Sequence, residues 1–217
     1  DNIKVVAEGN QRVLKARLDD AYFFYREDTK EPLENKVKLL ENVIYQARLG
    51  TIWEKTKRLQ GLAAFIAREL GFEEIELTER AALLCKADLE TSMVYEFPEL
   101  QGIMGRSYAL LDGEDPVVAQ AIFEHYLPRF TGDDLPVSSP GIALSLAEKF
   151  DNLVGNFAIG VRPTGSQDPY ALRRQALGIV AIVLGSNLEL DLAEVIRKSY
   201  RGFTASLDLT EEETENS

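Results

Sequence analysis

The sequence contains one cysteine, Cys85, and one histidine, His125. A single cysteine excludes an intramolecular disulfide and is typical of a reducing cytosol, so we expect a cytoplasmic protein. A single histidine excludes a histidine-rich metal site. The sequence also has no apolar run of the roughly 18–20 residues that span a bilayer, and no signal-peptide pattern opens it. We therefore expect no membrane association.

The chain also lacks an excess of positive charge and a methionine at residue 1. Its 24 Lys and Arg residues stand against 36 Asp and Glu residues, for a formal net charge of −12. Phosphates repel an acidic protein at long range, so a nucleic-acid-binding chain of this composition must gather its basic residues on one face. The missing methionine indicates either a piece of a longer protein or removal of the first residue by processing. A chain of 217 residues is long enough for one large domain or two small ones.

Apolar residues recur every three or four positions through most of the chain, which is typical of amphipathic helices. Val37, Leu40 and Ile44 show this spacing. Strict alternation of apolar and polar residues is missing, so we predict an all-α fold. Thr78 is the predicted N-cap of one helix. The later predicted helices span about 99–112, 115–130, 139–157, 168–187 and 191–200.

Three short segments resemble, in their order, the skeleton of the HD phosphohydrolase superfamily, a helical fold. They carry Lys55, the pair Cys85-Lys86, and Asp151. Active members offer a histidine, a His-Asp pair and a later aspartate to a divalent metal, so the resemblance implies a degenerate site in which only Asp151 survives. Two ammonium groups repel a cation, and one carboxylate does not make a metal-hydroxide nucleophile. We predict no metal and a scaffold used for binding, with a residual metal-dependent HD phosphohydrolase as the alternative.

A polar loop from Gly160 to Pro169 leads into a predicted helix. Asp168 suits the N-cap position and Pro169 the first turn. Hydroxyl and backbone N–H groups beside a helix N-terminus, with arginines nearby, can also hold a phosphate. The Gly-Lys-Ser/Thr element of a P-loop is missing. Structural capping and phosphate contact both stay open, and the candidate contact residues are Arg162, Thr164, Ser166, Arg173 and Arg174.

The single histidine allows two interpretations, and the single cysteine has one. His125 either caps carbonyls or forms hydrogen bonds locally at a helix end, or it acts as a general base with a distant partner. Cys85 follows two leucines and is expected to be a small buried hydrophobic residue.

Longer motifs carry a more specific resemblance. The run Lys86–Gly105, its later counterpart Arg162–Arg174 and the amino-terminal run Glu8–Phe24 resemble the β subunit of bacterial tetrameric glycyl-tRNA synthetase, in its HD-like region. The match extends from about Val5 to about Leu184. The resemblance implies a partner α subunit that uses ATP, Mg and glycine, an α–β heterotetramer, and glycine tRNA as substrate. It also implies that this part of the β subunit holds no catalytic residue and no cofactor.

These inferences divide the chain into three parts. Residues 1–50 form an N-terminal helical segment packed on the main domain, residues 51–205 form the HD-like helical domain, and residues 206–217 form an acidic tail or the start of a linker. We expect a non-catalytic region that handles tRNA and supports assembly, with the arginine-rich loop named above as its tRNA contact. A purely architectural module that positions neighbouring domains is the alternative. The two differ in whether Lys and Arg gather on one exposed face.

Overall fold

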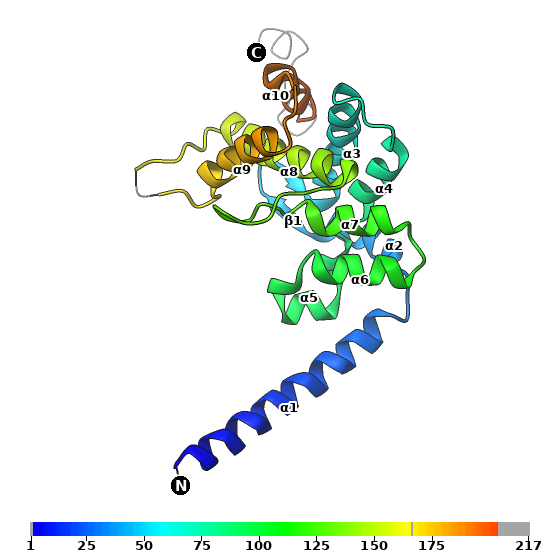
Figure 1. The fold of residues 1–217 in the computed structure, drawn as a ribbon, viewed down its shortest axis with the longest axis vertical. Coiled ribbons are helices and arrows are strands. Elements are labelled where there is room, and N and C mark those ends of the chain that lie inside the picture. Colours follow the sequence, from blue (N-terminus) through cyan, green and yellow to red (C-terminus); the bar gives the residue numbers. More distant parts are fainter. Residues whose placement is uncertain (1, 166, 204–217) are drawn as a thin grey trace.

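The computed structural model describes residues 2–165 and 167–203, and of Asn2 only the backbone. Most of these residues are in helices, which confirms the predicted all-α fold (Figure 1). The α-helices are α1 (Asn2–Asp28), α2 (Leu33–Lys36), α3 (Ile52–Glu69), α4 (Ile75–Leu84), α5 (Ser92–Glu96), α6 (Ile103–Leu111), α7 (Pro116–Glu124), α8 (Ser139–Ala158), α9 (Leu172–Gly185) and α10 (Leu192–Arg201). The 3-10 helices are η1 (Val37–Asn42), η2 (Ala87–Glu90) and η3 (Pro98–Leu100), and strands β1 (Ile44–Gln46) and β2 (Gly50–Thr51) form one antiparallel pair.

Helix α8 is the centre of the body, since it packs against α3, α4, α7, α9 and α10. Most of its residues are buried. Small side chains make this close packing possible. Ala143 and Ala147 on α8 are fully buried, as are Ala63 and Ala67 on α3 and Ala81 on α4. An alanine at a helix contact lets two backbones approach closely while still removing apolar surface from water.

Helix α3 begins with a capping box directly after the short strand pair. The Thr51 hydroxyl accepts a hydrogen bond from the backbone N–H of Glu54, and the Glu54 carboxylate accepts one from the backbone N–H of Thr51. This arrangement satisfies two backbone donors that the first helical turn leaves open. It fixes the start of α3 at Ile52, three residues before Lys55, and so sets which face of the helix that lysine occupies.

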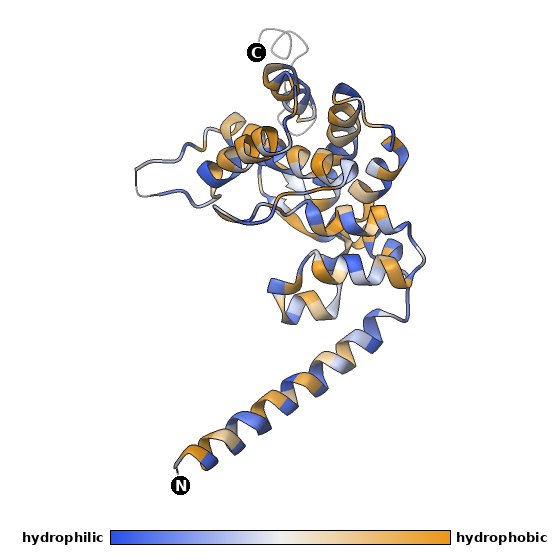
Figure 2. Ribbon diagram, viewed as in Figure 1, coloured by the Kyte–Doolittle hydropathy of each residue, from blue (hydrophilic) through white to orange (hydrophobic). Residues whose placement is uncertain are grey.

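Helix α1 projects away from the body and meets it mainly at its C-terminal end, near α5 (Figure 1). At that end Asp28 accepts hydrogen bonds from the backbone N–H groups of Ser92 and Met93 and from the Tyr108 hydroxyl. Apolar and polar residues alternate around α1 (Figure 2), and Ile3 and Leu18 are largely exposed. Among the described residues, no helix combines the length and apolar character needed to cross a membrane.

The rest of the predicted N-terminal segment packs into the body. Leu33 and Val37 belong to the main core, and Leu49 forms a second small core with Ile159 and Phe203. No observation tests the predicted boundaries after residues 50 and 205, nor the HD-like label, so these stay predictions. The predicted tail 206–217 lies outside the described residues.

Three predicted helix starts differ from the structure. The helix predicted from about residue 99 begins at Ile103, because Pro98–Leu100 form the separate 3-10 helix η3. Helix α4 begins at Ile75, and Thr78 is buried inside it with its hydroxyl donating to the Glu74 carbonyl instead of capping the helix. Helix α9 begins at Leu172, four residues after Asp168. The helix predicted over 115–130 is shorter in the structure: it ends at Glu124, and His125 is the C-cap residue of α7.

Candidate functional site

Three positions that the HD resemblance singled out come together at the centre of the body. Lys55 comes from α3, Lys86 from the turn after α4, and Asp151 from α8, and all three side chains are buried. Asp151 lies 96 residues from Lys55 in the sequence, yet its Oδ2 atom is 2.8 Å from Lys55 Nζ. The packing of α3 and α4 on α8 thus makes these scattered positions one cluster.

Lys55 is held as a charged group by its neighbours. Its Nζ donates to Asp151 Oδ2 and to Asn152 Oδ1, each at 2.8 Å, and lies 3.5 Å from Glu148 Oε2. Burial on its own lowers the pKa of a lysine, but the carboxylates of Asp151 and Glu148 outweigh it, and the pKa of Lys55 is raised. The ammonium group therefore stays protonated.

Both oxygens of Asp151, the predicted survivor of the metal ligands, accept from cations. Arg58 Nε donates to Oδ1 at 2.7 Å, while Lys55 Nζ and Arg58 Nη2 contact Oδ2. Within residues 2–165 and 167–203, no cluster of three or more His, Cys, Asp or Glu side chains suits a metal ion. The residues at this centre do not fit a divalent metal, because three cationic side chains surround its carboxylates.

Lys86 joins Glu148 to His125. Its Nζ lies 3.3 Å from Glu148 Oε1 and 2.9 Å from His125 Nε2. An ammonium group only donates, so Nε2 is the acceptor and the ring proton is on Nδ1, where it meets the Ile122 carbonyl. Burial and the Lys86 charge lower the pKa of His125, so the ring stays neutral. Of the two interpretations of His125, the contacts favour local hydrogen bonding.

Glu148 is the carboxylate that both lysines share. Burial raises the pKa of a carboxyl group, but Lys55 and Lys86 outweigh it and hold the pKa of Glu148 well below its usual value. The sequence reasoning missed this role, and it also missed Arg58 and Asn152. A signal was available, because Glu148, Asp151 and Asn152 are spaced to share one helix face, as are Lys55 and Arg58.

Cys85 is fully buried, and its thiol donates to the Ala82 carbonyl. Burial raises the pKa of the thiol to about 12, so the reactive thiolate does not form at neutral pH. These observations agree with the expectation of a small buried hydrophobic residue.

Two glycines of the 86–105 motif donate backbone hydrogen bonds to the side chain of Asp88. Its Oδ2 accepts from the backbone N–H groups of Gly102 at 2.6 Å and Gly105 at 3.1 Å. A Cβ atom at Gly105 would lie 2.8 Å from Ile122 Cγ2 and 3.0 Å from Asp88 Oδ2, so a side chain does not fit there. The motif therefore carries a buried carboxylate that links the turn after α4 to the start of α6.

Replacing Asp88 by asparagine is expected to change how stability depends on pH. Burial raises the pKa of Asp88 to about 6, and Oδ1 has no hydrogen-bond partner. A carboxyl group with a raised folded-state pKa stabilises most below its unfolded pKa of 3.8, and this contribution is lost as the pH rises through about 6. Asparagine does not titrate. Between about pH 4 and pH 7.5, the free energy of unfolding of D88N should gain about 2–3 kcal/mol on that of the wild type, measured by urea unfolding. A constant difference across this range would contradict the assignment.

The arginine-rich loop joins α8 to α9 and lies on the surface. Arg162, Thr164, Arg173 and Arg174 are exposed, and Ser166 lies outside the described residues. The Arg173 guanidinium donates to the carbonyls of Thr164 and Gly165, which closes the loop. The structure thus brings Arg173 and Thr164 together.

Asp168 caps α9 from outside the helix. Its carboxylate accepts from the backbone N–H groups of Leu172 at 2.7 Å and Arg173 at 3.0 Å, while Ala171 takes a left-handed conformation between them. This carboxylate occupies the N-terminal end of α9, so the capping interpretation holds for the helix terminus. Phosphate contact by the exposed arginine side chains stays a prediction.

Comparison with known proteins gives one consistent result. The family model described as glycyl-tRNA synthetase beta subunit matches residues 1–216. The chain is 59% identical to the glycine–tRNA ligase beta subunit of Syntrophomonas wolfei over 93% of its length, and 54% identical to that of Clostridioides difficile over 98%. It spans only 29% and 30% of these two relatives. By the match along nearly its full length, the chain belongs to the glycyl-tRNA synthetase beta subunit family.

Proposed function

We propose that this chain is a non-catalytic, tRNA-handling and assembly region of a glycine–tRNA ligase beta subunit. In this proposal it supports the ATP-dependent attachment of glycine to tRNA in the cytoplasm. Its partners are an α subunit, which uses ATP and Mg, and glycine tRNA, within an α–β heterotetramer. The observation that carries the proposal is the family match over residues 1–216, together with relatives that are named glycine–tRNA ligase beta subunits.

The buried centre supports the non-catalytic part of the proposal. A hydrolytic HD site needs carboxylates and histidines open to a metal and to water. Here Asp151 accepts from Lys55 and Arg58, and Glu148 is shared by Lys55 and Lys86. The only histidine is fixed through both ring nitrogens. Such a network holds helices α3 and α8 in register, which suits a scaffold.

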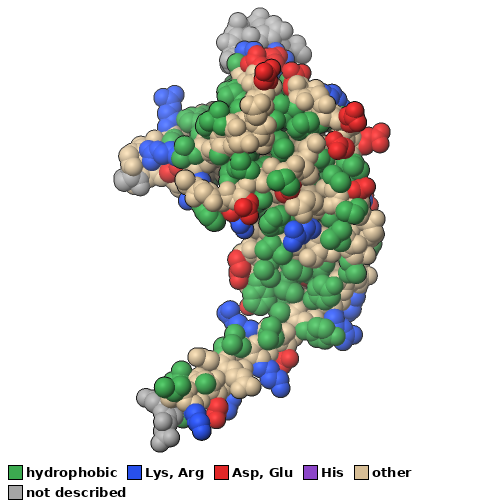
Figure 3. Space-filling model, viewed as in Figure 1, with side chains coloured by type: hydrophobic (Ala, Val, Ile, Leu, Met, Phe, Trp, Pro, Cys, Tyr) green, Lys and Arg blue, Asp and Glu red, His purple; other side chains and the backbone are tan. Residues whose placement is uncertain are grey.

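The loop between α8 and α9 supports the tRNA part. Figure 3 shows basic side chains on the side where this loop leaves the body. Arg162, Arg173 and Arg174 are exposed there in a chain of net charge −12. Arginine suits phosphate because its planar guanidinium donates two parallel hydrogen bonds. A local basic group of this kind is what an acidic protein needs to approach RNA.

The test is the double variant Arg173→Ala/Arg174→Ala in the full α–β assembly. Loss of two phosphate contacts should weaken tRNA binding about tenfold at moderate salt and make the salt dependence shallower. Arg174→Ala alone should weaken tRNA binding less than the double variant does. It leaves Arg173 in place, and Arg173 also donates to the loop carbonyls. The matched control is Lys38→Ala/Arg68→Ala, which removes two exposed cations elsewhere. If the loop variant and the control bind tRNA equally well, the loop is not a tRNA contact. That result would favour the alternative of a purely architectural module.

A further inference from the structure

Helix α1 carries its apolar side chains mainly on one side. At 3.6 residues per turn, most of them fall within about half of the helix circumference. These side chains form the apolar face of α1, which consists of Ile3, Val6, Val13, Leu14, Leu18, Tyr22, Phe24 and Tyr25. Most charged residues lie on the other half, namely Glu8, Arg12, Lys15, Asp19, Asp20, Arg26 and Glu27.

Most of the apolar face is open to water in this structure. Ile3, Leu14 and Leu18 are 85%, 61% and 69% exposed, and Figure 3 shows hydrophobic side chains along α1. An exposed apolar surface of this extent marks a binding surface. The seam of a two-stranded coiled coil uses only two positions in every seven, so it is narrower than this face. The width therefore favours packing on a folded body over pairing with α1 of a second copy.

The C-terminal end of the same face already packs on the body. The Tyr25 ring stacks on Tyr108 of α6, with the ring centroids 5.9 Å apart. Phe24 lines a hollow of about 430 Å³ in the corner between α1 and α5, together with Leu89 and Tyr95. Tyr95 is 85% exposed. The apolar face is thus continuous with an existing contact, and an element that covers it would also reach the hollow.

The carboxylates of the hollow add a charge requirement. Glu90 and Glu96 line it, and its lining contains no Lys or Arg. Opposite charges across an interface fix its register and exclude wrong partners. A partner that covers the apolar face should therefore place a lysine or an arginine over this corner.

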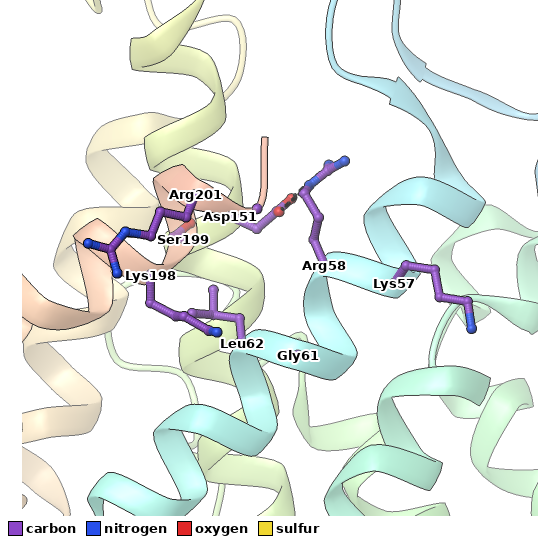
Figure 4. A pocket seen from close by; sticks show the side chains of 9 residues that line it. Lys57, Arg58, Gly61, Leu62, Asp151, Lys198, Ser199 and Arg201 are labelled. Atoms are coloured by element: carbon purple, nitrogen blue, oxygen red, sulfur yellow. Dashed lines mark hydrogen bonds and ion pairs between the residues drawn. The ribbon is translucent and has the colours of Figure 1, made fainter. Parts of the chain in front are cut away.

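The hollow of about 350 Å³ between α3 and α10 differs, because its polar groups are already engaged. Figure 4 shows Arg58 directed at Asp151 and Lys57 pointing away from it. Arg58 and the buried Lys55 contact both oxygens of Asp151. This hollow belongs to the buried network described above, whereas the corner between α1 and α5 is lined by exposed side chains.

We propose that the apolar face of α1 and the hollow beside α5 bind a segment of the same beta subunit that lies outside these 217 residues. The inference rests on the proposed function, in which this chain is one region of a longer subunit. The chain spans 29% and 30% of the two relatives compared above, so most of such a subunit is available to supply the segment. The segment presents apolar side chains to α1 and a cation to Glu90 and Glu96. RNA does not fit, because its phosphates offer no apolar surface and repel these carboxylates.

Hydrogen exchange of the α1 backbone amides tests the proposal, in the full-length beta subunit without its α subunit and in the 217-residue chain. A helix with few packed neighbours opens locally at little cost, so these amides should exchange fast in the chain. In the full-length subunit we expect their exchange to be slower by at least about a hundredfold.

Leu14→Glu/Leu18→Glu places two charges on the apolar face. In the full-length subunit it should return the exchange of α1 to within about tenfold of that in the chain. In the chain it should leave the thermal midpoint unchanged, because both side chains are in water there. Gly9→Glu/Ala16→Glu is the matched control, since it adds the same charge on the other half of α1, and a Cβ atom at Gly9 meets nothing within 4 Å. This control should keep the slow exchange.

Tyr95→Ser tests the hollow separately. It should speed the exchange of the last turns of α1 severalfold in the full-length subunit and leave the chain unchanged, because Tyr95 is exposed there. Equally fast exchange of α1 in the subunit and in the chain would overturn the proposal. Slow exchange that appears only after the α subunit is added, or only as the protein concentration rises, would also overturn it, in favour of the α subunit or of a second copy. None of these readouts involves tRNA, so failure of the loop assignment is read separately.

Discussion

Replacing Lys55 by methionine is expected to lower the free energy of unfolding by about 3–5 kcal/mol, the usual cost of removing one partner from a buried ion pair. Methionine keeps the aliphatic volume of the side chain, so the loss reports the missing charge. The reason for the large effect is that Lys55 contacts two carboxylates, the buried Asp151 and the partly buried Glu148. Asp151 would retain Arg58, and Glu148 would retain Lys86 as its cation and the hydrogen bond from Asn152.

Urea unfolding at neutral pH measures this effect, and the chain supplies its own control. Lys57 lies two residues further along α3, carries the same charge and is exposed. Lys57→Met should change stability by less than about 0.5 kcal/mol, as is usual for surface substitutions. If the two variants unfold at the same urea concentration, the buried network does not hold α3 to α8 as described.

The second large effect is expected at Phe203. Its ring is fully buried, packs with Leu49 and Ile159, and lies 4.1 Å from the Arg58 guanidinium carbon. A Cβ atom at Gly155 would lie 2.6 Å from its Cζ atom, so the ring presses directly on α8. Phe203→Ala should therefore cost about 3–5 kcal/mol, the range for deleting a buried phenylalanine.

Phe157→Ala is the matched control, because Phe157 is a phenylalanine of α8 that is 48% exposed. Its loss should cost about 1 kcal/mol or less, because most of its surface is in water already. Thermal or urea unfolding of both variants measures this difference in stability. A small effect at Phe203 would show that the second small core contributes little to the fold.

The sequence predicted the helices because apolar spacing reports directly on which face of a helix is buried. The resemblance to the HD superfamily implied that Lys55, Lys86 and Asp151 lie near one another, and the structure places all three around Glu148 and its helix α8. It did not predict that Glu148 links the two lysines or that Arg58 covers Asp151. Those contacts depend on the rotation of α3 against α8, which a local pattern does not contain.

Helix starts were less predictable, for a physical reason. Thr78 has the right side chain for an N-cap. However, Ile75 and the residues after it pack on the core, so α4 already begins three residues before Thr78. Asp168 caps α9 as expected, but from three residues before Ala171, because the left-handed turn at Ala171 brings its carboxylate back to the helix. Capping residues mark a helix end only when tertiary contacts agree.

The apolar face of α1 shows the opposite limit. Its spacing predicts a helix, and the structure has one, but the residues of its middle and N-terminal part remain exposed instead of packing on the body. Periodicity tells which side chains share a face, and the partner of that face depends on surroundings that periodicity does not encode.

Contact with tRNA is the central property proposed for this chain, and one measurement tests it. The purified chain is titrated with glycine tRNA and with an unrelated tRNA over a series of salt concentrations. We expect saturable binding whose logarithm falls linearly with the logarithm of salt, by about 0.9 per phosphate contacted, and a preference for glycine tRNA if base or shape readout contributes. Absence of binding even at low salt would contradict a tRNA-handling role for these residues and leave them as scaffold.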